Sequence, residues 1–302
     1  MNALALPSSP YAALRYPALL AIVIAAWGIN WSANKVLLQD IPPLWITVLR
    51  SVPACALVWL WALGRRALVM PTRADLPVLF AVGLLHMVAF SALSSFGLQS
   101  LPAGRSVVLA YTTPLWVLPL AHVFLGERLH GRRLLGLLAG LGGLAILLRP
   151  SAIAWHDPDI LRGHALILLA ALCWALCIVC VRRWRGPAAP WQMLPWQLLL
   201  ATALQGLLAL IFEGPLQVTF TAEIVGLLAY GSLIGNVLAY WAMNTVNRHL
   251  PASVVSLSLL GVPVFGLAFA CVVLGEPWDA SLGWGTLMIL GGIAAGLERR
   301  AR

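Results

Sequence analysis

The chain has 302 residues, of which 61% are hydrophobic and only 10% are charged, and its formal net charge is +9. A soluble domain carries about 25% charged residues, so this composition excludes an ordinary soluble protein and indicates a surface that mostly faces lipid. The basic residues lie in short turns between apolar runs, which is typical of membrane topology and argues against nucleic acid as a partner.

Ten apolar runs follow one another along the chain, and each is close to the roughly 20 residues that a helix needs to cross a bilayer. Only helices and closed barrels span lipid, and these runs are too long and too continuously apolar for barrel strands. We therefore expect an all-α integral membrane protein with ten transmembrane helices. The expected spans are 17–38, 43–63, 75–97, 102–125, 131–149, 162–182, 190–212, 222–246, 251–275 and 280–297.

The second half of the chain repeats the first with a shift of 149 residues. Leu101-Pro102-Ala103 recurs as Leu250-Pro251-Ala252, and Leu125-Gly126-Glu127 recurs as Leu274-Gly275-Glu276. A repeat of this length sets the architecture. We expect one membrane domain over residues 1–302, with five-helix repeats at 17–149 and 162–297 and an external linker at 150–161.

The basic residues also predict the orientation, because 14 of the 19 fall on the side of the two termini. The positive-inside rule then makes both termini cytoplasmic, in a multi-pass protein that we assign to a bacterial inner membrane. Each repeat has five spans, an odd number, so the second repeat enters the membrane from the opposite side. Inverted repeats are typical of secondary transporters, whose substrate site lies near the bilayer midplane.

Ordered motifs in both halves resemble the drug/metabolite transporter superfamily, in its ten-helix EamA branch. Beyond the two repeated motifs, the resemblance rests on Trp27-Gly28-x-Asn30, Lys35, Pro42-Pro43, Arg50 and, in the second half, Trp174-Ala175. It implies a ten-helix transporter. Within the branch the chain most resembles YddG-type exporters of aromatic and other amino acids, because of its aromatic content and an intramembrane histidine. The second half departs from the pattern: Ala175 stands where the first half has Gly28, and no lysine answers Lys35.

Pro114 and Pro263 interrupt spans four and nine at matching positions. Proline lacks a backbone donor and frees a carbonyl, which lipid tolerates only where a neighbour or a cavity satisfies that group. Two interpretations stay open. The prolines are static kinks that improve packing, or they are hinges beside the transport pathway, which their symmetric placement favours.

Spans five and ten are rich in small residues, which allow helix backbones to approach closely. The pairs four residues apart are Gly136 and Gly140, Ala139 and Gly143, and Gly292 and Gly296. We expect this face to pack within the chain rather than to dimerise, which favours a monomer. The five cysteines lie in apolar runs without histidine or carboxylate at ligand spacing, so no metal or other cofactor is expected.

Aromatic and polar side chains at mid-span depth form the candidate substrate site. An imidazole or an amide can hydrogen-bond a substrate that has lost its water, and a ring face can stack on an apolar side chain. Ordinary packing explains any one of them equally well. The candidate substrate-binding residues are His86, Trp174, Trp27, Asn30, Tyr111, Trp116, Tyr240 and Asn236. Arg50, about eight residues into span two, has three open roles: snorkelling, capping carbonyls or attracting anions.

These features predict a secondary transporter that exports amino acids, with aromatic or other neutral side chains, or related small metabolites. No span has a mid-membrane aspartate or glutamate, which favours facilitated diffusion over proton antiport. No phosphate-binding loop is present, so ATP does not drive the chain directly. The alternatives are a lipophilic-drug exporter and an integral-membrane enzyme acting on lipids, for which Glu127 with His130 is the nearest approach to a catalytic cluster. We expect a small-molecule substrate and membrane lipid as the partners.

Overall fold

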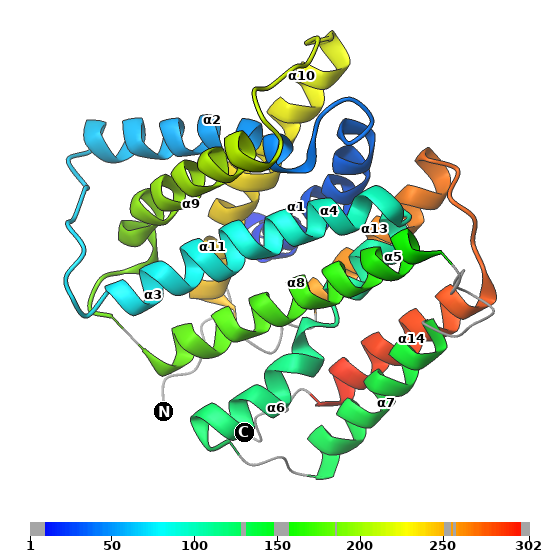
Figure 1. Ribbon diagram of the computed structural model, residues 1–302. Coiled ribbons are helices and arrows are strands. Elements are labelled where there is room, and N and C mark those ends of the chain that lie inside the picture. Colours follow the sequence, from blue (N-terminus) through cyan, green and yellow to red (C-terminus); the bar gives the residue numbers. More distant parts are fainter. Residues whose placement is uncertain are drawn as a thin grey trace, which may run out of the picture.

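The computed structural model of the chain describes residues 10–127, 131–147, 157–184, 186–250, 255 and 258–296. Every regular element in this part of the chain is a helix (Figure 1). The first half contains α1 (Pro10–Leu37), α2 (Pro43–Gly64), α3 (Leu76–Phe80), η1 (Ala81–Phe90), α4 (Ser91–Ser100), α5 (Ala103–Ala110), α6 (Thr113–Leu125) and α7 (Gly131–Leu147). The second half contains α8 (Pro158–Arg183), α9 (Pro190–Phe212), α10 (Ala222–Ala229), η3 (Tyr230–Leu238), α11 (Ala239–His249), α13 (Gly261–Val273) and α14 (Ala280–Gly296).

These elements form ten apolar segments, which we number as spans one to ten in chain order. Within the described residues, seven segments have the length and composition needed to cross a membrane, and three are shorter apolar helices. Elements α3, η1 and α4 continue as one segment, and so do α10, η3 and α11. Each predicted run coincides with one segment, so the all-helical fold of ten spans is confirmed. Residues 150–156 of the expected linker and 251–254 at the start of span nine lie outside the described residues.

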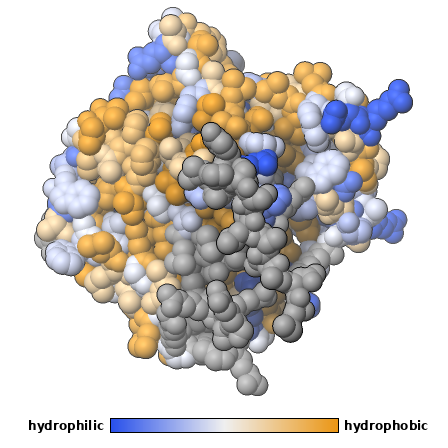
Figure 2. Space-filling model, turned by 180° about the vertical axis from the view of Figure 1, so that it is seen from behind, coloured by the Kyte–Doolittle hydropathy of each residue, from blue (hydrophilic) through white to orange (hydrophobic). Residues whose placement is uncertain are grey.

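Large apolar side chains cover the outside of the bundle. Val272, Phe212 and Leu60 are 84%, 72% and 67% exposed. Figure 2 shows apolar residues over much of the face that is not grey, with the hydrophilic residues at its margins and beside the grey part. An exposed apolar surface of this extent is one that lipid, not water, has to cover.

Spans three and eight each contain a π-helical stretch, which no sequence pattern predicted. η1 begins at Ala81 and η3 begins at Tyr230, 149 residues later, so the two stretches occupy the same place in the two repeats. π-helical turns are rare and occur mostly at functional sites. In the middle of spans three and eight, the side chains therefore do not follow the regular spacing of an α-helix.

Span four is broken by a turn at residues 111–112, between α5 and α6. Pro114 is the second residue of α6. Because proline has no N–H, it cannot donate the helical hydrogen bond to the carbonyl of Ala110, four residues earlier. The hydroxyl of Thr113 donates to this carbonyl oxygen at 2.8 Å. A side chain therefore satisfies the carbonyl that the proline frees.

Span nine is interrupted at the corresponding place, since α13 begins at Gly261 and Pro263 is its third residue. In both spans the break precedes the proline, which lies in the first turn of the next helix. The first turn tolerates proline well, because its N–H groups have no partner inside the helix. The prolines thus start a new helical segment and do not bend a continuous one.

The repeated Leu-Gly-Glu motif ends α6 and α13 in the same way. Gly126 has φ of 67° and Gly275 has φ of 66°, the left-handed conformation that glycine adopts without steric cost. The following N–H of Glu127 donates back to Ala121 O at 3.3 Å. The glycine therefore ends the helix and carries the glutamate side chain away from its axis.

Helices α7 and α14 lie side by side at one edge of the bundle (Figure 1). A Cβ on Gly143 would lie 2.8 Å from Gly285 O, and one on Gly292 would lie 2.5 Å from Gly136 O. The backbones thus approach so closely that only glycine fits. These small residues of spans five and ten pack against each other within one chain.

Candidate substrate cavity

A cavity of about 1080 Å³ lies among spans one to four and six to eight. Small-molecule sites typically measure about 300–1,000 Å³, so the space is large enough for a metabolite. Spans five, nine and ten contribute no residue to its lining in the described part of the chain. The cavity is therefore built between the two repeats, mainly from their first, second and third helices.

One wall consists of rings that meet at Trp174 of α8. The centroids of Trp174 and His86 are 5.3 Å apart with the rings stacked, and Phe90 lies 5.2 Å from the same indole. Tyr111, from the turn in span four, meets Trp174 edge-on at 5.7 Å. Such offset and edge-to-face pairs stabilise an aromatic group beyond simple area burial. We call these four residues the aromatic wall.

Trp27 of α1 lies against span eight, on another side of the cavity. Its Nε1 donates to Gly235 O at 3.1 Å, and its ring meets Tyr240 edge-on at 5.7 Å. The hydroxyl of Tyr230 in turn donates to Ala26 O at 3.0 Å. These contacts join the first helix of one repeat to span eight of the other.

A polar corner, which we define as Arg50, Asn34, Asn236 and Asn30, also lines the cavity. Arg50 donates from Nη1 to Asn34 Oδ1 at 2.8 Å and from Nη2 to Asn236 Oδ1 at 3.5 Å. Gly231 leaves room for the guanidinium, since a Cβ there would lie 2.4 Å from Arg50 Nε. Amide oxygens solvate this charge, but an amide does not neutralise it.

The structure brings most of the candidate residues together. Seven of the eight line the cavity, namely His86, Trp174, Trp27, Asn30, Tyr111, Tyr240 and Asn236. Trp116 is not among the lining residues; its Nε1 donates to Thr112 Oγ1 at 3.2 Å instead. Pro114 and Pro263 lie outside the lining as well, at the helix starts described above.

The lining residues that were absent from the candidate set include Phe90, Asn34 and Gln205. Phe90 follows His86 by four residues, so helical spacing alone puts them on one face. Asn34 has the same relation to Asn30. Gln205 of α9 donates from Nε2 to Met87 O at 2.7 Å, within η1. Nothing in the sequence predicts that bond, because it depends on how spans three and seven pack.

Carboxylates of the second repeat cap helices of the first at one end of the bundle, which we call the capped end. Glu276 accepts hydrogen bonds from the N–H groups of Ala103 at 2.5 Å and Gly104 at 2.8 Å, the first two residues of α5. Glu213 does the same for Leu44 and Trp45, the second and third residues of α2, at 2.9 and 3.1 Å. A carboxylate at a helix N-terminus satisfies unpaired donors and favours the helix dipole.

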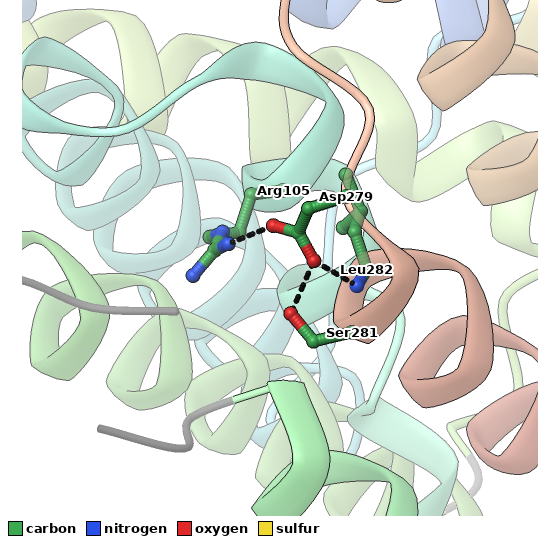
Figure 3. A network of polar contacts seen from close by, with 4 residues as sticks. All are labelled: Arg105, Asp279, Ser281 and Leu282. Atoms are coloured by element: carbon green, nitrogen blue, oxygen red, sulfur yellow. Dashed lines mark hydrogen bonds and ion pairs between the residues drawn. The ribbon is translucent and has the colours of Figure 1, made fainter. Parts of the chain in front are cut away.

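An ion pair joins the repeats at the same end (Figure 3). Arg105 Nη2 lies 3.2 Å from Asp279 Oδ2, while the other oxygen of Asp279 accepts from Leu282 N at 2.8 Å and from the hydroxyl of Ser281. Burial alone raises the pKa of Asp279, but these hydrogen bonds and the Arg105 charge outweigh it and hold the pKa below its usual range. Asp279 therefore stays ionised at neutral pH.

The opposite end carries a different set of contacts. Arg182, in the last turn of α8, pairs with Glu127 at 2.5 Å. The cavity lining extends to this end, where it includes Trp61, Trp191 and His249 near the ends of α2, α9 and α11. The cavity thus reaches the Glu127 end, while carboxylate caps hold the other end together.

Comparison with known proteins agrees with this architecture. The model of the EamA-like transporter family matches residues 15–149 and again residues 161–295. A solved crystal structure with 21% sequence identity has a TM-score of 0.64 and covers 93% of this chain and 95% of its own. At that identity the likeness concerns the fold alone.

Several bacterial relatives extend over most of the chain. The uncharacterized transporter YoaV of Bacillus subtilis is 27% identical over 275 residues, which cover 90% of this chain and 92% of YoaV. A probable amino-acid metabolite efflux pump of Escherichia coli is 26% identical over 290 residues, with coverage of 91% and 92%. Protein PA1977 of Pseudomonas aeruginosa is 35% identical over 220 residues, with coverage of 72% and 73%. Two family matches, one on each repeat of a membrane-spanning helical fold, show that this chain is a transporter, not an enzyme, and belongs to the EamA-like transporter family of the drug/metabolite transporter superfamily.

Proposed function

We propose that this transporter exports amino acids, with aromatic or other neutral side chains, or related small metabolites, across the bacterial inner membrane by alternating access. The observation that carries the proposal is the aromatic wall of His86, Phe90, Tyr111 and Trp174 in one cavity between the repeats. Ring faces stack on an apolar or aromatic side chain. The relative from Escherichia coli, described as a probable amino-acid metabolite efflux pump, supports the same substrate class.

The two ends of the bundle support alternating access. With cytoplasmic termini, as the positive-inside rule predicts, the capped end is periplasmic and the cavity extends toward the cytoplasm. An exporter loads its substrate in such an inward-facing state. Release on the other side then requires the caps at Glu276 and Glu213 to open.

A lipophilic-drug exporter is the second candidate, since aromatic walls also suit large apolar compounds. The polar corner argues against it. An apolar substrate would remove water from Arg50 and from the amides of Asn30 and Asn236 without replacing its hydrogen bonds, which costs about 1–3 kcal/mol for each group left unpaired. A substrate with a polar head and an apolar side chain satisfies both regions.

Counterflow in proteoliposomes tests the proposal. Vesicles loaded with unlabelled phenylalanine should take up labelled phenylalanine, tyrosine and tryptophan faster than protein-free vesicles. An imposed pH gradient should leave the final level unchanged, because we expect facilitated diffusion. No exchange of any amino acid, together with transport of a lipophilic cation such as ethidium, would favour the drug exporter and sink the proposal.

Removing the centre of the aromatic wall should weaken substrate binding. We expect Trp174→Ala and His86→Ala to lower substrate affinity about ten- to a hundredfold, since each removes one stacking face or hydrogen bond. The measurement is the substrate-induced rise in melting temperature of the purified protein. Trp284→Ala is the control, because this residue of α14 is 65% exposed on the lipid-facing surface. A loss of stability without any loss of the substrate-induced rise would assign both residues to packing.

Labelling of single cysteines in a Cys-free background tests the orientation. Gln217, between α9 and α10, and Met70, between α2 and α3, are both exposed and lie at opposite ends of the bundle. An impermeant thiol reagent applied outside the cell should label Gln217→Cys and not Met70→Cys. Gly186 is unsuited to this experiment, because a Cβ there would lie 2.4 Å from Asp75 Oδ1. The reverse labelling pattern would contradict cytoplasmic termini.

A further inference from the structure

We propose that the polar corner recognises the head group of an α-amino acid, with Arg50 binding its carboxylate and Asn30 Oδ1 binding its ammonium group. The inference rests on the proposed function and names the two groups that any accepted substrate must carry. It predicts that this transporter distinguishes amino acids from amines and from simple carboxylic acids.

Arg50 is a charged side chain without an acidic partner among the described residues. None of the cavity-lining residues in that part of the chain is an aspartate or a glutamate. An arginine inside a membrane protein is costly unless something pairs with it. Its two hydrogen bonds, to Asn34 and Asn236, use two of the five N–H groups, and its Nε is buried with no partner. The guanidinium therefore keeps donors for a planar anion, and a carboxylate matches its geometry.

Asn30 supplies the complementary group. Its Oδ1 is buried and has no hydrogen-bond partner among the described residues. Leaving a buried acceptor without a hydrogen bond costs free energy. A Cβ placed on Gly235 would lie 3.2 Å from this oxygen and 3.6 Å from Arg50 Nη2. The acceptor and the donor thus both border the position beside Gly235. An α-amino acid carries its ammonium and carboxylate on a single carbon, so both can be satisfied together only by such neighbouring groups.

Span eight is shaped to leave this space open. Gly231 and Gly235 lie four residues apart in η3, on the side that faces Arg50 and Asn30. Any larger residue at Gly231 would meet the guanidinium at 2.4 Å. The Trp27 indole, bonded to Gly235 O, fixes α1 and η3 relative to each other. Gly231 therefore admits the guanidinium, and Gly235 keeps the position beside Arg50 and Asn30 free for a compact polar head.

The aromatic wall lies in the same cavity and accounts for the rest of the substrate. The head group binds at the corner between α1, α2 and η3, and the side chain extends toward Trp174 of α8 and His86 of η1. Each repeat contributes to both regions, since α1, α2 and η1 belong to the first repeat and η3 and α8 to the second. A substrate that spans the two regions therefore contacts both repeats at once.

Three ligands with one aromatic body test the proposal by isothermal titration of the purified full-length protein. L-phenylalanine carries both charged groups, 3-phenylpropionate carries only the carboxylate, and 2-phenylethylamine carries only the ammonium. We expect wild-type protein to bind phenylalanine about ten- to a hundredfold more tightly than either partial ligand.

The variants assign each group to its residue. Arg50→Gln should weaken phenylalanine and 3-phenylpropionate by about ten- to a hundredfold and leave 2-phenylethylamine nearly unchanged. Arg50→Lys should recover part of the loss, because it keeps the charge without the bidentate geometry. Asn30→Ala should weaken phenylalanine and 2-phenylethylamine and leave 3-phenylpropionate nearly unchanged. Arg105→Gln is the matched control, since Arg105 lies at the capped end outside the lining and should keep the wild-type order of ligands.

Equal weakening of all three ligands by Arg50→Gln would assign Arg50 to structure alone and overturn the proposal. Tight binding of 2-phenylethylamine to the wild type, or no binding of any of the three, would overturn it as well. A failure of the export proposal alone would give a different result. Phenylalanine would then bind in the expected pattern but would not exchange in counterflow, whereas exchange without the pattern would leave export standing and remove the head-group site.

Discussion

The Leu-Gly-Glu turn occurs after α6 and again after α13, and the two glutamates contact different partners. Glu276 accepts both of its hydrogen bonds from backbone N–H groups at the start of α5. Glu127 forms an ion pair with Arg182 at 2.5 Å, in which the two side chains are 30% and 45% exposed. One sequence motif thus provides a half-buried helix cap at one end of the molecule and an exposed ion pair at the other.

The basic residues near these turns show the same relation. Lys35 and Arg182 each follow the motif tryptophan of their repeat, Trp27 or Trp174, by eight residues. Arg182 pairs directly with the glutamate of the other repeat. Lys35 instead donates to Leu98 O at 2.7 Å and to Gln99 O, with the charge of Glu276 close enough to act on it. At these matched positions the repeat therefore places a cation and a carboxylate at each end, and local packing decides which contacts they make.

Among the changes that test this difference between the two ends, removal of the cap at Glu276 should lower the stability most. Glu276→Gln removes the charge and leaves one oxygen to accept from two N–H groups, so we expect a loss of about 2 kcal/mol. The melting temperature should fall, and hydrogen exchange of residues 101–110 should become faster. Hydrogen–deuterium exchange with mass spectrometry measures the second effect directly.

Glu223→Gln is the control for that experiment, because Glu223 is an exposed glutamate in the first turn of α10. It should change neither the melting temperature nor the exchange of α5. Unchanged exchange in Glu276→Gln would mean that the cap does not hold the start of α5, and the contrast between the two ends would lose its basis.

The sequence predicted the spans and the repeat, because both depend on local signals. An apolar run long enough to cross a bilayer identifies a helix wherever it lies. The π-helical stretches at Ala81 and Tyr230 were not predictable in this way, because their residues differ and only the backbone shares the feature. The cap formed by Glu276 was also missed, since its partners lie 172 and 173 residues away in the chain.

The depth of a residue was easier to predict than the face it occupies. Tyr111 and Trp116 lie only five residues apart in span four, yet only Tyr111 lines the cavity. The turn at residues 111–112 separates them, and five residues of regular helix would already rotate the direction by about 140°. Arg50 shows the converse case. Its position allowed three roles, and only the amides of Asn34 and Asn236 reveal that it faces the cavity.

Substitutions at the two proline sites should change the stability by an intermediate amount. Pro114→Ala adds an N–H that meets Ala110 O, which already accepts from Thr113, so the gain in stability should be a few tenths of a kcal/mol. The matching residues before Pro263 are Gly261 and Val262, which carry no hydroxyl. Pro263→Ala should therefore stabilise more, by up to about 1 kcal/mol.

Transport rates decide between hinge and packing at these sites. A continuous helix bends less readily, so we expect both alanine variants to exchange substrate several-fold more slowly while substrate affinity stays the same. Counterflow and isothermal titration of the two variants provide the measurements. Two variants that fold and transport at the original rate would identify both prolines as packing features.

The smallest effect should come from the exposed ion pair. A double-mutant cycle with Arg182→Gln and Glu127→Gln removes the pair and cancels every other contact of either residue, so the melting temperatures report the coupling alone. We expect at most about 1 kcal/mol, decreasing further as salt is raised, because exposed pairs are weak and screened. The same cycle on Arg105 and Asp279 should give a coupling that salt affects less, since the Arg105 side chain is only 9% exposed. If the Arg182–Glu127 coupling proves the larger and resists salt, the Glu127 end is the more firmly held, and the assignment of the capped end as the closed side of the cavity must be reversed.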